Sequence, residues 1–309
     1  ELKNIGIPFT NGHVKTVIIG TIEGNNPKSK TVLLRADIDA LPIVEKNNVS
    51  YKSSNEGVMH ACGHDAHTAS LIGAAKILNS LRDEFTGTIK ILFQPAEEKL
   101  PGGAKLLIEE GVFESIQPNV CLAQHVFPEL PAGKVGFKKG LYMASTDELH
   151  VTVHGKGGHA ALPHKVIDPV VIAAQLIINL QQIISRNNNP ITPSVLSFGY
   201  IEGKGATNVI PNEVKIKGTF RTFDENWRDV AHEKMLKMAN SIATSMGGSC
   251  DFEIKNGYPF LTNDFEITDL AIEAAKEFLG EENVVDLDLR MTSEDFAYLS
   301  HEFLSLIHI

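Results

Sequence analysis

The sequence has few of the features that mark a secreted, membrane-spanning or nucleic-acid-binding protein. It contains three cysteines in 309 residues, which is too few for a disulfide framework. No apolar run reaches transmembrane length, and no signal-peptide pattern opens the chain. Asp and Glu number 38 against 28 Lys and Arg, and no basic stripe is interleaved with aromatic residues. These absences predict a cytoplasmic protein that binds neither nucleic acid nor membranes.

The first part of the chain alternates between strand and helix patterns. Strands are expected at residues 14–24, 31–39, 86–93 and 120–126, because β-branched residues are concentrated there between turn residues. Helices are expected at residues 64–81 and 103–110, where apolar residues recur at helical spacing. Such alternation predicts an α/β layer with a mostly parallel sheet.

A different rhythm begins near residue 146. Strands are predicted at residues 147–153, 194–202, 213–220 and 250–255, and helices at residues 169–185 and 227–246. This βαββαβ order is the ferredoxin-like plan. The first rhythm then resumes with a helix at 265–278, a strand at 284–289 and a helix near Ser293. We therefore predict a first domain at 1–145 and 257–309, interrupted by a second domain at 146–256.

Cys62 and His64 form the first candidate for a chemical role. They are two residues apart on a segment that leads into the predicted helix, so both side chains can face one way, and Gly63 allows a bend between them. A thiolate and an imidazole together suit a borderline-soft divalent ion. A buried cysteine beside helix-capping residues is an equally open interpretation.

Glu97 and Glu98 directly follow a predicted strand of the parallel sheet. Open α/β sheets bind their ligands at the carboxyl ends of their strands. Adjacent extended residues point in opposite directions, so one carboxylate can bind a metal while the other serves as general base. A solvated acidic pair at the start of a helix would have the same sequence.

His125 ends another predicted strand of the same sheet. A histidine in this position is often only a hydrogen-bonded core residue. Here, however, three strand ends each offer a ligand type at one sheet edge, namely Cys62 with His64, then Glu98, then His125. This convergence favours a metal centre.

Three residues of the second predicted domain are candidates for binding a substrate. His159 follows a glycine-rich loop and could donate a hydrogen bond to a developing oxyanion. Asn208 and Arg221 could bind a substrate carboxylate. Ordinary surface or turn roles are the alternatives for all three.

Several motifs together resemble one family, the aminoacylase branch of the two-metal metallopeptidases, which includes hippurate hydrolases, N-acyl-amino-acid amidohydrolases and indole-acetyl-amino-acid hydrolases. The matching segments run in order from about residue 32 to residue 298. They are residues 34–42, 59–67, 93–98, 155–164, 208–211, 218–221 and 292–296.

The resemblance implies a role for each matching position. Cys62 is expected to be a metal ligand that bridges two ions, with His64, Glu98 and His125 as further ligands. Glu97 is implied to be the general base that acts on a water activated by the metal. Asp37 and Asp39 are implied to orient the metal ligands without binding the ions themselves. The second domain is implied to be a lid and dimerisation domain from which His159 reaches the site, as a residue of the same subunit or of its partner.

The resemblance also implies that both ends of the first domain are truncated. Members of this family usually begin with several tens of additional residues and end with a segment that carries one more histidine ligand. His308 does not stand in the context expected for that ligand.

The function we predict is metal-dependent hydrolysis of N-acyl amino acids by a homodimer. The cofactors are expected to be two divalent ions, Mn²⁺ or Zn²⁺, with Co²⁺ or Ni²⁺ as alternatives. A dipeptidase, an N-acetyl-diaminopimelate deacetylase and a non-catalytic dimeric binding protein with a degenerate site remain alternatives. A cysteine hydrolase is less favoured, because Cys62 and His64 are too close in sequence to form the required nucleophile–base hydrogen bond readily.

Overall fold

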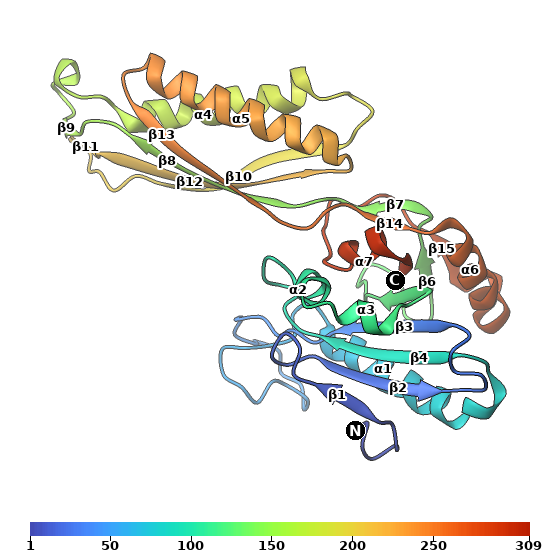
Figure 1. Cartoon of the computed structure of the whole chain (residues 1–309). Helices are drawn as coiled ribbons and strands as arrows, with labels where there is room; N and C mark the ends of the chain where they lie inside the picture. The colour runs from blue at the N-terminus through green and yellow to red at the C-terminus, as the bar shows by residue number, and fades with distance from the viewer. The chain divides into compact units, whose positions relative to one another are not determined.

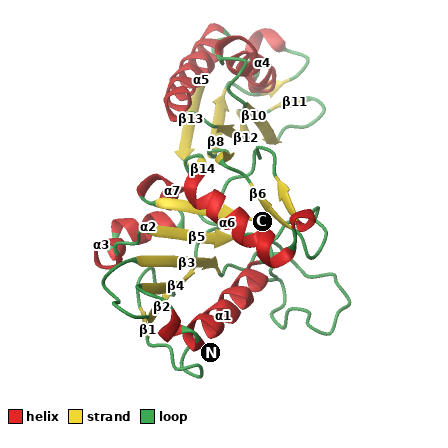
Figure 2. Cartoon of the chain, turned by 90° about the vertical axis from the view of Figure 1, so that its right-hand side faces the viewer, coloured by secondary structure: helices red, strands yellow, loops and turns green.

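The computed structural model describes all 309 residues, which form two compact units (Figures 1 and 2). The first unit comprises Glu1–Tyr142, Leu261–Leu289 and Glu294–Ile309. The second comprises Met143–Phe260 and Arg290–Ser293. Most of the second unit is therefore one segment inserted into the sequence of the first.

A six-stranded sheet forms the centre of the first unit, in the order β1-β2-β4-β3-β5-β16. The pairs β4–β3, β3–β5 and β5–β16 are parallel, whereas β1 and β2 add antiparallel strands at one edge. The strands are β1 (Phe9–Asn11), β2 (Ile18–Glu23), β3 (Thr31–Asp37), β4 (Thr88–Gln94), β5 (Val120–Gln124) and β16 (Leu304–His308).

Helices cover this sheet and bury its apolar side chains. Leu71 and Ala75 of helix α1 pack with Ile22, Ala36 and Ile91 of the sheet strands. Helix α6 contributes Ile272 to a second cluster that includes Leu306 of β16. The helices are α1 (His64–Ser80), α2 (Gly103–Glu109), α3 (Val112–Ile116), α6 (Phe265–Leu279) and α7 (Ala297–Glu302). Two short pairs complete the unit: β6 (Val135–Phe137) with β15 (Val284–Asp286), and β7 (Gly140–Met143) with β14 (Leu261–Asn263).

The second unit is a four-stranded antiparallel sheet in the order β10-β12-β8-β13, with two helices on one face (Figure 1). The elements follow one another as β8 (Asp147–His154), α4 (Pro169–Gln182), β10 (Ser194–Glu202), β12 (Glu213–Thr222), α5 (Glu225–Ser245) and β13 (Ser249–Asn256). Asp168 caps α4, with proline at its first position, and Asp224 caps α5. A core of buried apolar residues from both helices and three of the strands holds the layers together.

The predicted fold class is confirmed: a mostly parallel α/β sheet is joined in sequence to an inserted ferredoxin-like unit. Several element boundaries differ from the prediction. The strand predicted from residue 14 begins at Ile18, because Val14 and Lys15 have φ of 41° and 64° and form a turn. The strand predicted at 284–289 is only Val284–Asp286, and the helix predicted near Ser293 begins at Ala297. The segment Leu304–His308 is a strand paired with β5.

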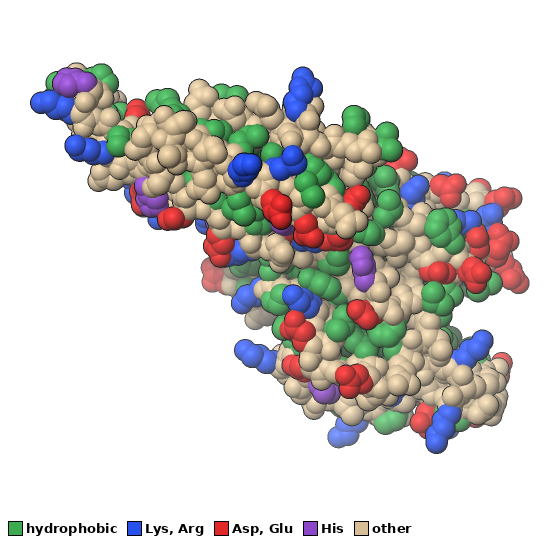
Figure 3. All heavy atoms as spheres, turned by 45° about the horizontal axis from the view of Figure 1, so that its top comes forward, with side chains coloured by type: hydrophobic (Ala, Val, Ile, Leu, Met, Phe, Trp, Pro, Cys, Tyr) green, Lys and Arg blue, Asp and Glu red, His purple; other side chains and the backbone are tan.

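The surface carries both signs of charge. On the face drawn in Figure 3, acidic and basic side chains are interspersed, and no continuous basic stripe is visible there. None of the helices combines the length and the apolarity that crossing a bilayer would require.

A buried ion-pair cluster lies at the start of β8. The Asp147 carboxylate has no exposed surface and accepts hydrogen bonds from Arg228 Nε at 3.0 Å and His232 Nε2 at 2.7 Å. The Arg228 guanidinium also donates to the carbonyl oxygens of Thr146 and Gly257 at 3.1 Å each. Burial opposes ionisation of Asp147, but the hydrogen bonds from His232 and Arg228 outweigh it and lower its pKa.

Asp147→Asn is expected to destabilise the second unit by about 3–5 kcal/mol at neutral pH, because it leaves Arg228 with one anion fewer in a buried site. The depressed pKa of the folded state means that the stabilisation is present above the unfolded carboxyl pKa of about 4 and is lost as pH falls below it. The difference between wild type and variant should therefore shrink on acidification.

Urea unfolding followed by the fluorescence of Trp227, the single tryptophan, measures this difference within the second unit. Asp251→Asn is the matched control, because it removes a carboxylate from an exposed pair with His154 on the same sheet and should change little. Equal losses for the two variants would contradict the prediction.

Candidate metal centre

The candidate centre lies where strands of the first unit end and helix α1 begins. Asp37 ends β3, Gln94 ends β4, and His125 directly follows β5. Gly63, with φ of 82°, lies between Cys62 and His64, the first residue of α1. The carboxyl ends of parallel strands meet at one sheet edge, so segments distant in sequence bring their polar side chains together there.

Cys62 and His125 face each other across this edge. The Sγ of Cys62 lies 3.5 Å from Nε2 of His125, and His125 Nδ1 donates to the carbonyl oxygen of Val126 at 2.7 Å. Because Nδ1 carries the proton, Nε2 has a free lone pair on the side of the thiol. A histidine that donates one ring nitrogen to a carbonyl is the usual arrangement of a metal ligand.

His64 is fully buried, and neither of its ring nitrogens has a hydrogen-bond partner. Its Nδ1 lies 3.8 Å from Asp37 Oδ1, and its Nε2 lies 4.0 Å from Glu98 Oε1. Buried polar atoms without a partner are rare in folded proteins and call for an explanation. Burial lowers the pKa of His64, which favours the neutral ring with a free lone pair. A cation bound between His64, Cys62 and His125 would give the His64 ring a partner.

Asp39 fixes the backbone that carries Glu97 and Glu98. Its carboxylate accepts from the amide nitrogens of Ala96 at 2.7 Å, of Glu98 at 3.2 Å and of Glu97 through a further hydrogen bond. Ala96 has φ of 64°, a conformation that needs such support in a residue with a Cβ. Three amides held by one carboxylate restrict the directions in which both glutamates project.

His67 joins this centre although it carried no predicted role. Its Nδ1 lies 2.6 Å from Asp37 Oδ1, and its Nε2 accepts from the amide of Val126 at 2.8 Å. Both ring nitrogens are therefore used, so His67 supports the centre and is not free to bind an ion. The signal was present in the sequence, because His64 and His67 are three apart and share a helix face.

Glu294 and Asp295 are two further buried carboxylates that carried no predicted role individually, although their motif belonged to the resemblance. Arg35 contacts both, at 2.9 Å from Glu294 Oε1 and 2.7 Å from Asp295 Oδ1. Carboxylate oxygens of Glu97, Glu294 and Asp295 lie within 4.8 Å of one another. Burial, followed by repulsion from Glu294 and Asp295, raises the pKa of Glu97 well above its usual value.

The donor set fits divalent cations. Burial and the nearby carboxylates of Glu98 and Glu97 raise the pKa of the Cys62 thiol to about 12, so it keeps its proton unless a cation compensates the local negative charge. Thiolate, imidazole and carboxylate ligands together suit zinc and its neighbours among the transition metals. The structure brings together Cys62, His64, Glu98 and His125, the four predicted ligands.

Two of the substrate-binding candidates meet in the second unit. Strands β9 (Gly158–His159) and β11 (Val209–Ile210) form a small antiparallel arm in which Val209 pairs with His159. Ala160 N donates to the carbonyl oxygen of Asn208 at 3.0 Å, so His159 and Asn208 are neighbours. His159 Nδ1 accepts from the Ala161 amide at 3.1 Å, which leaves a proton on Nε2 to donate.

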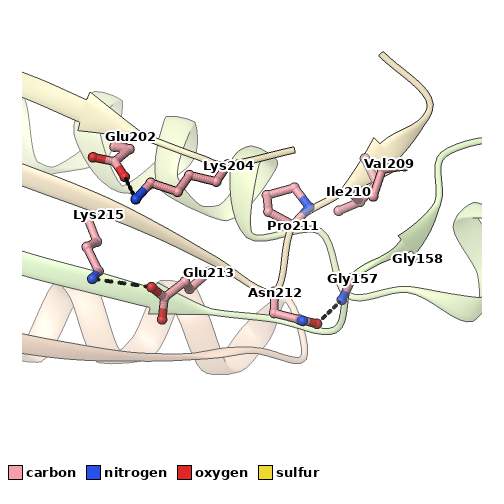
Figure 4. A pocket seen from close by; sticks show the side chains of 10 residues that line it. All are labelled: Gly157, Gly158, Glu202, Lys204, Val209, Ile210, Pro211, Asn212, Glu213 and Lys215. Atoms are coloured by element: carbon pink, nitrogen blue, oxygen red, sulfur yellow. Dashed lines mark hydrogen bonds and ion pairs between the residues drawn. The ribbon is translucent and has the colours of Figure 1, made fainter. Parts of the chain in front are cut away.

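A pocket of about 550 Å³ lies at the base of this arm (Figure 4). Gly157 N donates to Asn212 Oδ1 at 2.9 Å there, and the ion pairs Glu202–Lys204 and Glu213–Lys215 line its wall. The pocket therefore carries alternating charges and no cluster of ligand-type residues.

Arg221 lies at the other end of the same sheet. It pairs with Val195, and its Nη1 donates to the carbonyl oxygen of Met291 at 2.9 Å and to Ser293 Oγ at 3.2 Å. Strand β12 runs from Glu213, beside the arm, to Arg221, a separation of roughly 26 Å at the usual rise per residue. Within one chain, Asn208 and Arg221 therefore lie too far apart to bind the same carboxylate.

Residues 33–306 match the model of peptidase family M20/M25/M40, and the chain belongs to this family. It is 42% identical over 297 residues to an N-acetyl-L-cysteine deacetylase of Bacillus subtilis, a match that covers 96% of this chain and 70% of the relative. It is 41% identical to a hippurate hydrolase of Campylobacter jejuni, covering 96% of this chain and 77% of that protein. The predicted family resemblance is confirmed.

The solved structure of a Bacillus subtilis protein, described as a dinuclear metal-binding peptidase of the M20 family, is similar as well. It is 34% identical, with a TM-score of 0.81, and the match covers 99% of this chain and 79% of that one. The two proteins therefore share the same fold as well as the same family.

Gly103→Ala is expected to disturb the centre through the backbone. A Cβ on Gly103 would lie 1.8 Å from the carbonyl oxygen of Pro95, so the turn that carries Glu97 would have to move. We expect a loss of about 1–3 kcal/mol in stability, as for other overpacked sites. Divalent-ion binding, measured by calorimetric titration, should weaken.

Gly73→Ala is the matched control, because a Cβ at this exposed position of α1 meets nothing within 4 Å. It should stabilise the helix by up to about 1 kcal/mol and leave ion binding unchanged. Wild-type ion affinity in Gly103→Ala would contradict the role assigned to the turn.

Proposed function

We propose that this protein hydrolyses the amide bond of N-acyl amino acids and that Cys62, His64, Glu98 and His125 hold two divalent ions for the reaction. The observation that carries the proposal is the buried, unpartnered His64 ring surrounded by ligand-type side chains, next to the buried Glu97 carboxylate. The relatives named as a deacetylase of N-acetyl-L-cysteine, a hippurate hydrolase and an N-acyl-L-amino acid amidohydrolase support this substrate class.

Divalent ions bound at this centre supply Lewis acidity, which polarises the amide carbonyl and makes water a stronger acid. Glu97 accepts the proton of the attacking water and returns it to the leaving amine. Glu97 is buried next to the proposed ligand Glu98, so its carboxylate is held close to the ion site. Zn²⁺ and Mn²⁺ are the ions we propose, since the ligands include sulfur, nitrogen and oxygen.

We propose that the working form is a homodimer. Strand β10 is an edge of its sheet and leaves backbone groups available for pairing, with Tyr200 and Ile201 40% and 58% exposed. His159 and Asn208 lie at one end of this sheet and Arg221 at the other, so the three can surround one small substrate only if they come from two chains. In this arrangement His159 donates to the oxyanion, and Arg221 and Asn208 bind the carboxylate of the amino acid.

Glu97→Gln is expected to lower kcat by about 10²–10⁴-fold, the contribution typical of a general base, with little change in metal content. Release of amino acid from N-acetyl and N-benzoyl amino acids and from dipeptides, with and without added Zn²⁺ or Mn²⁺, measures the effect and the substrate class together. Glu109→Gln on the exposed face of α2 is the control. Unchanged turnover in Glu97→Gln would remove the assigned base, and preferential release from dipeptides would favour a dipeptidase.

Subunit mixing tests where His159 acts. His159→Ala and Glu97→Gln are each expected to be nearly inactive as pure preparations. If His159 acts in the partner's site, co-refolding equal amounts should restore about a quarter of wild-type activity, because half of the dimers are hybrids and each hybrid has one intact site. Action within a single subunit predicts no recovery.

A further inference from the structure

Arg35 is the most enclosed cation of the first unit and lies directly behind the candidate metal centre. It is 2% exposed, it follows the apolar run Val32–Leu34 in strand β3, and it is two residues from Asp37. Its Nε donates to Gln94 Oε1 at 3.1 Å, and Nη1 donates to Asp37 Oδ2 at 2.6 Å. Two nitrogens of the planar guanidinium therefore each have a defined acceptor, an arrangement that arginine can provide and lysine cannot.

The first branch of contacts leads from Arg35 to a proposed metal ligand. Asp37 uses one carboxylate oxygen for Arg35 and the other for His67 Nδ1, at 2.6 Å. His67 accepts the amide proton of Val126, and the Val126 carbonyl accepts from His125 Nδ1. Each residue in this series of hydrogen bonds has a partner on both sides. The last bond, from His125 to the Val126 carbonyl, fixes which ring nitrogen of His125 faces Cys62.

The second branch leads from Arg35 to the proposed general base. Nη2 contacts Asp295 Oδ1 at 2.7 Å and Glu294 Oε1 at 2.9 Å. Asp295 is anchored by Gln94 Nε2 and by the amide of Ala104, so its position is fixed from three sides. Glu294 in turn has a carboxylate oxygen within 4.8 Å of one from Glu97. Arg35 thus offsets part of the charge that surrounds Glu97.

A purely structural arginine would also be buried and paired, and the second unit contains one for comparison. Arg228 is 5% exposed and contacts two carboxylates and two backbone carbonyls, yet none of its partners is a proposed ligand or base. The two branches from Arg35 instead end at His125 and beside Glu97. This difference separates a positioning role from a role in folding alone.

We infer that Arg35 is a positioning residue that acts through Asp37 and His67 on His125, and through Glu294 on Glu97. Its polar contacts are with the side chains of Asp37, Gln94, Glu294 and Asp295. The inference rests on the proposed function for the chemistry performed at the centre. Its test uses ion binding in addition to turnover, so the two can fail separately.

Co²⁺ is a suitable probe, because its visible absorption reports coordination geometry and its near-ultraviolet band reports a thiolate ligand such as Cys62. Arg35→Lys keeps the positive charge but offers a point donor in place of a planar fork, so it cannot hold Asp37, Gln94 and Asp295 together. We expect Co²⁺ affinity to fall by about 10–100-fold, as for other residues that orient metal ligands, and the absorption bands to shift. Arg228→Lys is the matched control and should leave both unchanged.

His67→Gln tests the first branch without removing the buried charge. If Arg35 and His67 act through the same series of hydrogen bonds, the double variant Arg35→Lys/His67→Gln should lose little more Co²⁺ affinity than the more affected single variant. Losses that multiply in the double variant would mean that the two residues act independently, which would overturn the proposed chain.

Circular dichroism and thermal unfolding establish which variants are folded. Folded Arg35→Lys with wild-type Co²⁺ affinity, absorption and kcat would overturn the inference. If Arg35→Lys does not fold, His67→Gln decides: reduced affinity with a shifted spectrum supports the chain, and a wild-type titration overturns it. Wild-type protein that binds Co²⁺ but hydrolyses no N-acyl amino acid would contradict the proposed function and leave the positioning result standing.

Discussion

The guanidinium of Arg35 lies among the carboxylates of Asp37, Glu294 and Asp295, nearly without contact with solvent. Burial would lower the pKa of Arg35, but the three carboxylates outweigh it and raise the pKa above its usual range. Charges in such a place are tolerated only when they are paired and hydrogen-bonded. One guanidinium balances only part of the acidic charge, which also includes Glu97. The remainder makes the centre suitable for divalent cations.

The parallel sheet explains why these groups lie together. Its strands end at one edge, so β3, β4 and β5 deliver Asp37, Gln94 and the segment of His125 to neighbouring positions. The turns after the strands are then fixed by local devices. Asp39 holds three consecutive amides, and Gly103 leaves room for the Pro95 carbonyl. The sheet provides the location, and these contacts provide the directions of the side chains.

The second unit follows a different principle. Its antiparallel sheet has a separate core. The buried cluster around Asp147 holds the backbone at Thr146 and Gly257, close to the two ends of the inserted segment. The arm with His159 and Asn208 extends from one end of that sheet, while Arg221 is held at the other. A single copy of this unit divides the candidate substrate-binding residues between two ends of one sheet, which is the reason to consider two chains together.

The sequence by itself determined the order of the main helices and strands, the two kinds of sheet and the four side chains proposed as metal ligands. These features depend on periodicity and on short motifs, in which each residue is constrained mainly by its near neighbours. Only the tertiary structure decided that Arg35 pairs with Asp295, 260 positions away, and that both nitrogens of His67 are already used. It also decided that Asn208 and Arg221 lie apart. Partners of buried charges and the positions of strand ends are set by packing across the whole unit, and local sequence does not encode that packing.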